Sequence, residues 1–199
     1  GFVFGDFNGD GKLDLATSGH FCCGDHVFLG DGAGNFVESS QGLPTSGGSH
    51  KLAAGDFDGD GRDELVDTLF STSPPLTNGV HIWKLGAGGA WSLFTSVFFD
   101  QAWGVAAGAL DGDGWVALAV GIQQDNVGTL GSVRALLNNA GNGTFTDSST
   151  GLPFMDTLHS DVALGDMDND GDLDIASGSG GAFTGGDVRV YLNDGNAAS

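Results

Sequence analysis

Residues 5–19 read GDFNGDGKLDLATSG. Asp6, Asn8, Asp10 and Asp14 bring four oxygen-bearing side chains within nine positions, and glycines lie between them. Carboxylates at this density repel one another unless a cation lies between them. The stretch therefore indicates a cation-binding loop, and its repetition along the chain decides the fold.

The same pattern occurs four times in the 199 residues. It returns as GDFDGDGRDELVDT from Gly55 and as GDMDNDGDLDIASG from Gly165. A copy in which alanines replace two of the oxygen donors, GALDGDGWVALAVG, starts at Gly108. The motifs begin 50, 53 and 57 residues apart, which is a period typical of propellers and solenoids.

Short apolar segments surround each copy and predict β-strands. A strand of small residues precedes the loop, as in LAAGDF, an apolar strand follows it, as in LDLATSG, and a third strand comes after a gap, as in VHIWKLG. GNFVES, GAWSLFTS and GTFTDS predict a fourth strand in three copies. The sequence thus predicts an all-β fold, a β-propeller of four-stranded antiparallel blades. A β-sandwich or a short-repeat β-helix fits the long, regular period less well.

We expect a single propeller-type repeat domain, with repeats at about 1–50, 51–103, 104–160 and 161–199. The last repeat stops at VYLNDGNAAS, without residues for a fourth strand. Three interpretations stay open: the chain is an excerpt of a longer propeller, four blades close imperfectly, or another subunit supplies the strand by β-augmentation.

A bound calcium ion accounts for the crowding of the acidic loops. Ca²⁺ takes about six to eight oxygen ligands, and a loop with oxygens at positions 1, 3, 5, 7 and 9 can surround it. Position 7 would offer its backbone carbonyl, and the glycine at position 6 allows the sharp turn. The predicted ligands are Asp6, Asn8, Asp10, Lys12 and Asp14; Asp56, Asp58, Asp60, Arg62 and Glu64; and Asp166, Asp168, Asp170, Asp172 and Asp174.

The third loop is degenerate, because Ala109 and Ala117 stand at positions 1 and 9. We therefore expect about three Ca²⁺ sites, with weak or no binding in the third loop. Every ligand position of an intact loop is filled by the loop itself, which favours a structural role for the metal.

The stretches GDFNGDGKLDL, GDFDGDGRDEL and GDMDNDGDLDI resemble the FG-GAP/VCBS repeats of the integrin α-subunit propeller and of many secreted bacterial and fungal proteins. The resemblance spans the whole chain. It implies a β-propeller with Ca²⁺ in the loop between the first and second strands of a blade, in proteins that adhere, bind sugars or scaffold larger enzymes. The chain departs from the family pattern at Ala109 and Ala117, and in having four units where such propellers usually have seven.

The charge of the chain limits its partners and its location. With 26 acidic and 6 basic residues, the formal net charge is −20, which argues against nucleic acid and against an anionic membrane surface. No apolar run approaches the roughly 20 residues that would cross a bilayer, so we expect no membrane insertion. Calcium modules of the extracellular type bind at roughly 10⁻⁴ to 10⁻³ M, which predicts a secreted, extracellular protein.

Cys22 and Cys23 are adjacent in a loop between two predicted strands. They cannot join distant strands, so a vicinal disulfide is the favoured interpretation. Two loop thiols, or a transition-metal pair formed with His20 and His26, are the alternatives.

Aromatic residues and one glycosylation motif complete the candidate sites. Trp103 and Trp115 are the candidate ligand-binding residues, and Trp115, in the broken loop, is expected to be exposed. Trp83 and Trp91 lie in predicted strands and are expected in the core or between blades. Asn142, in Asn-Gly-Thr, is a candidate N-glycosylation site in a turn.

The sequence favours a binding or assembly module over an enzyme. The five histidines are scattered, and no nucleophile or phosphate-loop motif is present. We expect a protein or carbohydrate ligand for a secreted, calcium-stabilised propeller. Two alternatives are a fibre subunit that self-assembles through the open last blade, and the scaffold domain of a polysaccharide-acting enzyme.

Overall fold

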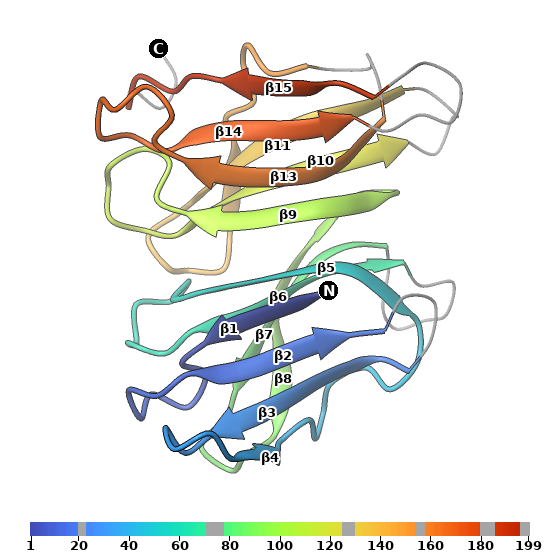
Figure 1. Ribbon diagram of the computed structural model, residues 1–199, viewed down its shortest axis with the longest axis vertical. Coiled ribbons are helices and arrows are strands. Elements are labelled where there is room, and N and C mark those ends of the chain that lie inside the picture. The colour runs from blue at the N-terminus through green and yellow to red at the C-terminus, as the bar shows by residue number, and fades with distance from the viewer. Residues whose placement is uncertain (20–22, 71–77, 125–129, 154–157, 180–185, 196–199) are drawn as a thin grey trace. The chain divides into compact units, whose positions relative to one another are not determined.

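The computed structural model describes residues 1–19, 23–70, 78–124, 130–153, 158–179 and 186–195 (Figure 1). Within these ranges the chain forms fifteen β-strands and no helix. Accordingly, nothing in the described part of the chain is a helix long and apolar enough to span a membrane.

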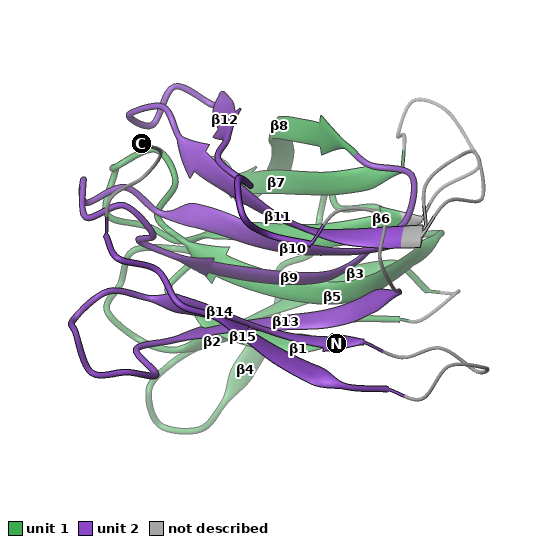
Figure 2. Cartoon of the chain, turned by 90° about the horizontal axis from the view of Figure 1, so that it is seen from above, with its two compact units in different colours: residues 1–98 green, residues 99–199 purple. Residues whose placement is uncertain are grey.

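The chain divides into two compact units, unit 1 over residues 1–98 and unit 2 over residues 99–199 (Figure 2). Each unit contains two sheets, which we number as blades along the chain. Every sheet is an antiparallel meander in which consecutive strands are neighbours.

Unit 1 holds two four-stranded blades. The strands of blade 1 are β1 (Phe2–Gly5), β2 (Asp14–Ser18), β3 (Asp25–Gly30) and β4 (Phe36–Glu38). The strands of blade 2 are β5 (Gly48–Gly55), β6 (Glu64–Phe70), β7 (Gly79–Leu85) and β8 (Trp91–Phe98). Strand β5 contacts both β1 and β2, so the first strand of blade 2 packs against the first two strands of blade 1.

Unit 2 repeats this arrangement with one fewer strand among its described residues. The strands of blade 3 are β9 (Ala102–Gly108), β10 (Ala117–Gln124), β11 (Leu130–Asn138) and β12 (Phe145–Asp147). The described strands of blade 4 are β13 (His159–Gly165), β14 (Asp174–Ser179) and β15 (Val188–Tyr191). The predicted all-β blades are confirmed, including the three fourth strands β4, β8 and β12.

Apolar residues from consecutive blades pack into a core cluster in each unit. In unit 1, two of the predicted core tryptophans, Trp83 and Trp91, pack with Phe7, and the Trp91 ring meets the Phe7 ring edge-on at a centroid distance of 5.6 Å. In unit 2, Leu110 and Val133 of blade 3 pack with Val162 and Ile175 of blade 4. Burial of these side chains supplies the main driving force for blade packing.

An apolar residue stands at the second position of each acidic loop. Phe7, Phe57 and Leu110 follow the first position of loops 1, 2 and 3, and all three side chains are buried. Met167 takes that place in loop 4 and is exposed. A buried apolar side chain therefore anchors loops 1, 2 and 3, but not loop 4.

Candidate metal centre

Four acidic loops connect the first and second strands of the four blades: loop 1 (residues 6–14), loop 2 (56–64), loop 3 (109–117) and loop 4 (166–174). All four start from the same strand register. The last loop position pairs with the glycine before the loop, as in Gly5 with Asp14. The other pairs are Gly55 with Glu64, Gly108 with Ala117 and Gly165 with Asp174.

The carboxylate at position 1 organises each intact loop. Asp6 Oδ1 accepts hydrogen bonds from the amides of Gly9 and Asp10 at 2.8 and 3.0 Å, and Oδ2 accepts one from Gly11 at 2.7 Å. In loop 2, Asp56 accepts the corresponding bonds from Gly59, Asp60 and Gly61. In loop 4, Asp166 accepts from Asp170 and Gly171. Each loop is thus curled around its first carboxylate.

Two positions in each loop, rather than one, have left-handed backbone. Position 6 is glycine as predicted, with φ between 78° and 100° at Gly11, Gly61, Gly114 and Gly171. Position 4 also has positive φ, which was not predicted from the sequence. Glycine occupies it in three loops, while Asn169 (φ 66°) occupies it in loop 4, and asparagine is one of the few side chains that tolerate this region.

Carboxylates from positions 1, 3 and 9 converge in two of the loops. One oxygen each from Asp56, Asp58 and Glu64 lies within 4.8 Å of the others. The same holds for Asp166, Asp168 and Asp174 in loop 4. In loop 1, position 3 is Asn8, whose amide oxygen accepts from the amide of Asp10 at 2.9 Å. In these two loops, three of the positions predicted as metal ligands from the sequence lie close together in space.

The position 9 carboxylates are buried and hydrogen-bonded at the base of the loops. Asp14 accepts from the amides of Phe7 and Gly30 at 3.0 and 2.8 Å. Burial raises the pKa of Asp14, and it raises the pKa of Glu64 to about 7. In contrast, hydrogen bonds from the amides of Asn193 and Met167 lower the pKa of Asp174.

Position 7 was predicted to offer only its backbone carbonyl, and the structure shows where its basic side chains lie. Lys12 Nζ lies 3.3 Å from Asp10 Oδ2, and Arg62 forms a tighter pair with Asp60 at 2.6 Å. The pKa of Asp60 is lowered, and the largest cause is the side-chain hydrogen bond that Arg62 donates to it. Two of the three loops therefore pair the acid at position 5 with a basic side chain.

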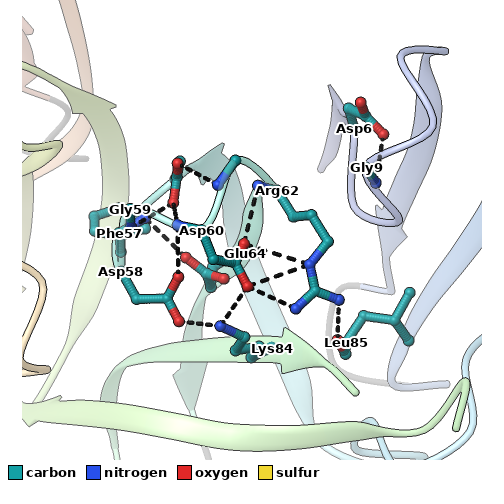
Figure 3. A network of polar contacts seen from close by, with 12 residues as sticks. Asp6, Gly9, Phe57, Asp58, Gly59, Asp60, Arg62, Glu64, Lys84 and Leu85 are labelled. Atoms are coloured by element: carbon teal, nitrogen blue, oxygen red, sulfur yellow. Dashed lines mark hydrogen bonds and ion pairs between the residues drawn. The ribbon is translucent and has the colours of Figure 1, made fainter. Parts of the chain in front are cut away.

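Loop 2 also has a second cation, which comes from strand β7. Lys84 Nζ contacts Asp58 Oδ2 and lies 2.7 Å from Asp60 Oδ2 (Figure 3). Burial acts to lower the pKa of Lys84, but hydrogen bonds to Asp58 and Asp60 outweigh it and raise that pKa. Nothing in the local sequence around Lys84 indicated this contact.

Loops 1 and 2 are joined to each other inside unit 1. Asp63, at position 8 of loop 2, accepts a hydrogen bond from the amide of Asp6 at 2.8 Å, and its own amide donates to the Asp6 carbonyl at 3.0 Å. Arg62 packs beside Gly9, because a Cβ built on Gly9 would lie 2.7 Å from Arg62 Cγ. Asp6, the first predicted ligand of loop 1, is therefore held by a residue of loop 2.

Loop 3 keeps the fold of the others without the end carboxylates. Asp111 and Asp113 remain, and the amide of Trp115 donates to Asp113 Oδ1 at 2.8 Å. Burial, followed by a hydrogen bond with Asp113, raises the pKa of Asp111. Beside the loop lies a groove of about 530 Å³, which we call the blade 3 groove. It is lined by Asp111, Asp113, Leu137, Asn138, Asn139, Ala140, Thr146, Asp147 and Ser148.

The other predicted sites lie apart from the loops or outside the described residues. Trp103 is half-buried, and Trp115 is half-buried rather than exposed as expected. Asn142 is exposed, and the Thr144 hydroxyl donates to its Oδ1 at 2.6 Å. Cys23 is exposed, but Cys22 lies outside the described residues, so the vicinal disulfide stays a prediction.

The alternative cysteine-histidine site is untested for the same reason, because His20 is not among the described residues either. The other histidine of that hypothesis, His26, has its own partners. Its Nδ1 lies 2.8 Å from Glu38 Oε1, and its Nε2 lies 3.1 Å from the Cys23 carbonyl.

A buried polar cluster in unit 1 was missed by the sequence analysis. Ser49 Oγ donates to Asp25 Oδ2 at 3.1 Å, His81 Nδ1 lies 3.1 Å from Asp67 Oδ1, and Trp83 Nε1 donates to Asp67 Oδ2 at 2.7 Å. These residues come from strands β3, β5, β6 and β7, so no local motif marks them. The Ser, His and Asp side chains are at most 3% exposed, which leaves no access for a substrate.

Burial, followed by the charge of Asp67 and a hydrogen bond with it, raises the pKa of Asp25 to about 8. Asp25 Oδ1 has no donor among the described residues. A protonated Asp25 resolves this, because its hydroxyl can then donate to the Asp67 carboxylate.

Comparison with known proteins identifies similar sequences and folds. A family model described as FG-GAP-like repeat matches residues 6–66 and 110–177. No curated protein matches the chain. A solved structure of a lectin from Agrocybe aegerita, described as specifically recognising non-reducing terminal N-acetylglucosamine, superposes with a TM-score of 0.55 at 20% sequence identity. The alignment covers 98% of this chain and 52% of the lectin chain, so this chain spans about half the length of that protein.

Proposed function

Since the chain belongs to the family of FG-GAP-like repeat proteins, we propose that it is a calcium-stabilised β-propeller module that binds a carbohydrate or protein ligand outside the cell. The observation that carries the proposal is the repeated carboxylate arrangement. Asp56, Asp58 and Glu64 in loop 2 converge within 4.8 Å, and so do their counterparts in loop 4.

The donor set of the loops fits calcium. Every predicted ligand is a carboxylate, amide or carbonyl oxygen, and hard cations such as Ca²⁺ prefer oxygen ligands in a flexible shell. Positions 1, 3, 5 and 9 would hold the ion through side chains, and position 7 through its carbonyl. Asp6 Oδ2 and Asp56 Oδ2 each accept one amide hydrogen bond and keep a further lone pair for a metal.

Bound calcium would stabilise the blades by removing repulsion. The chain has a formal net charge of −20, and the loops concentrate that charge at the ends of four strand pairs. A ligand that binds only the folded loops stabilises the folded state by linkage. Sites of this kind are filled at extracellular calcium and empty in the cytosol, which supports a secreted location.

Calorimetric titration of the chelator-stripped protein with Ca²⁺ tests the proposal. We expect about three sites, and a higher unfolding temperature with calcium than without. Asp56→Ala should remove one site, because it deletes the carboxylate around which loop 2 folds. Asp111→Ala, in the degenerate loop, is the matched control and should leave the number of sites unchanged. An absence of binding at millimolar Ca²⁺ would rule out the metal role.

For the ligand, we propose a saccharide in the blade 3 groove. Its volume of about 530 Å³ suits a small sugar, and its carboxylate, amide and hydroxyl groups suit sugar hydroxyls. The lectin with the similar fold is described as recognising terminal N-acetylglucosamine. A glycan array with such termini tests this, with Asp113→Ala, in the lining of the groove, expected to weaken binding. Asp31→Ala, at an exposed turn of blade 1, is the control and should have no effect.

The open edge of blade 4 favours self-assembly as a second candidate. Strand β15 pairs only with β14 among the described strands, and its Val188 and Val190 side chains are 78% and 47% exposed. A strand with one described neighbour and exposed apolar side chains can pair with a strand from a second copy of the chain. Light scattering over a dilution series would show growth with concentration, and Val190→Lys should suppress it. A constant monomer mass would exclude this role.

A further inference from the structure

The ammonium group of Lys84 lies beside loop 2, close to the place where a calcium ion would bind. Its ammonium contacts Asp58 and is 2.7 Å from Asp60, the acids at positions 3 and 5 of the loop (Figure 3). The side chains of Lys84 and Asp58 are only 26% and 14% exposed, so solvent screens their attraction less than at an open surface. Asp58 also belongs to the carboxylate group formed with Asp56 and Glu64.

The register of the third strands shows that Lys84 is unusual among the blades. In blade 2, Trp83 of the third strand pairs with Leu65 of the second strand, and Lys84 is the next residue of the third strand. The same register defines the position that corresponds to Lys84 in each other blade. In blades 1, 3 and 4, the residue in that place is a leucine. These leucines are Leu29, Leu137 and Leu192.

Blade 3 shows that this register position faces the acids of its loop. Leu137 lines the blade 3 groove together with Asp111 and Asp113, which hold positions 3 and 5 of loop 3. The same place in blade 2 is filled by the charged end of Lys84. The position therefore decides whether a leucine or an ammonium group lies against the two acids.

We propose that Lys84 is a tethered counter-ion that competes with calcium for loop 2, an inference that rests on the proposed calcium-binding function. An ammonium and a divalent cation on the same two carboxylates repel each other strongly. Calcium can enter loop 2 only when Lys84 moves away and gives up both ion pairs. Loop 2 is then the weakest of the three intact sites, and the one whose charge is best neutralised without calcium.

The affinity difference is measured on single-loop proteins by calorimetry with Ca²⁺. Asp6→Ala with Asp166→Ala leaves loop 2 intact, and Asp6→Ala with Asp56→Ala leaves loop 4. We expect loop 2 to bind at least about tenfold more weakly than loop 4, because calcium must displace a bound cation only in loop 2.

Exchanging the residues should exchange the affinities. Lys84→Leu should tighten loop 2 by about tenfold, and Leu192→Lys should weaken loop 4, whereas Lys84→Arg keeps the charge and should leave loop 2 weak. If loop 4 binds and Lys84→Leu does not tighten loop 2, the counter-ion role is wrong and the calcium function stands. If neither loop binds calcium, both proposals fail.

A second measurement needs only one substitution in the otherwise unchanged chain. In chelator, Lys84→Leu should lower the unfolding temperature, because Asp58 and Asp60 lose their partner. In saturating calcium the variant should recover, so its gain on adding calcium exceeds that of the wild type. Equal gains in the two proteins would overturn the inference.

Discussion

Units 1 and 2 are built from the same kind of blade but bury different polar groups. In unit 1, blade 1 buries Asp25 at a register position where blade 3 of unit 2 buries Val133. Ser49 and Asp67 of blade 2 correspond to His159 and Ser177 of blade 4, and there His159 Nδ1 lies 2.6 Å from Ser177 Oγ. The blade tolerates either set, so its strand pairing does not depend on the polar residues.

The loops show the same contrast. Unit 1 has two intact acidic loops, and unit 2 has one intact and one degenerate loop. Gly108 nevertheless pairs with Ala117 as Gly55 pairs with Glu64. Because the loop register survives loss of the position 9 carboxylate, apolar packing defines the blade, and the carboxylates add a separate property to it.

Of the changes considered, loss of the Trp91 side chain from the core of unit 1 should destabilise the protein most. This side chain is 4% exposed, its Nε1 donates to the Ser39 carbonyl at 2.7 Å, and its ring packs on Phe7. Trp91→Ala should lower the free energy of unfolding of unit 1 by about 4 kcal/mol, through lost burial and a cavity. Urea unfolding, with hydrogen exchange of peptides from each unit, measures the change.

Phe145 is the matched position in unit 2, because it pairs with Asn138 as Trp91 pairs with Leu85. It is only half-buried, so Phe145→Ala should cost less, about 1–2 kcal/mol. Equal losses at the two positions would contradict the view that unit 1 has the more tightly packed fourth strand.

The stability of unit 1 should depend on pH through the buried carboxyl group of Asp25. Asp25 has its pKa raised to about 8 by burial and by Asp67, whereas an unfolded aspartate titrates near about 3.9. Between these values the folded state keeps a proton that the unfolded state has lost. The stability of unit 1 should therefore fall as the pH rises from about 4 to 8, by up to about 1.4 kcal/mol per pH unit.

Asp25→Asn isolates this contribution, because an amide cannot titrate. Glu64 and Asp14, whose pKa values are also raised, are present in both proteins, so the difference between the two slopes belongs to Asp25 and its partner Asp67. Urea unfolding at several pH values from 5 to 8 should give a flatter slope for the variant. Parallel slopes would mean that Asp25 is ionised in the folded protein.

The blades and the loops could be predicted because their signals are local. The alternation of apolar segments marked the strands, and the spacing of Asp56, Asp58 and Glu64 marked carboxylates that the structure brings together. Position 6 glycines were predicted from the turn, and position 4 could have been found from the same repeated spacing.

What the sequence could not reveal depends on contacts between distant strands. Lys84 is 26 residues from Asp58, and Asp25 is 24 residues from Ser49, so only the registers of the strands bring them together. The sequence also did not predict that the Trp115 side chain is half-buried. Its loop lacks the end carboxylates, and the sequence does not show how the chain packs there.

The smallest expected effect tests whether the two loops of unit 1 act together. Asp63 holds the amide of Asp6 at 2.8 Å, while the corresponding position in loop 4 is Leu173. Asp63→Leu therefore makes loop 2 resemble loop 4 at this place. We expect a loss of about 1 kcal/mol in the free energy of unfolding of unit 1, the usual size for one hydrogen bond, together with weaker calcium binding in loop 1.

Asp63→Asn is the control, because its amide oxygen can still accept from Asp6. It should lose less stability than Asp63→Leu. The backbone hydrogen bond from Asp63 to the Asp6 carbonyl remains in both variants, so loop 1 should keep its fold, and calorimetry on a protein with only loop 1 intact can compare the affinities. If both variants bind calcium like the wild type, calcium binding in loop 1 does not depend on the Asp63 side chain.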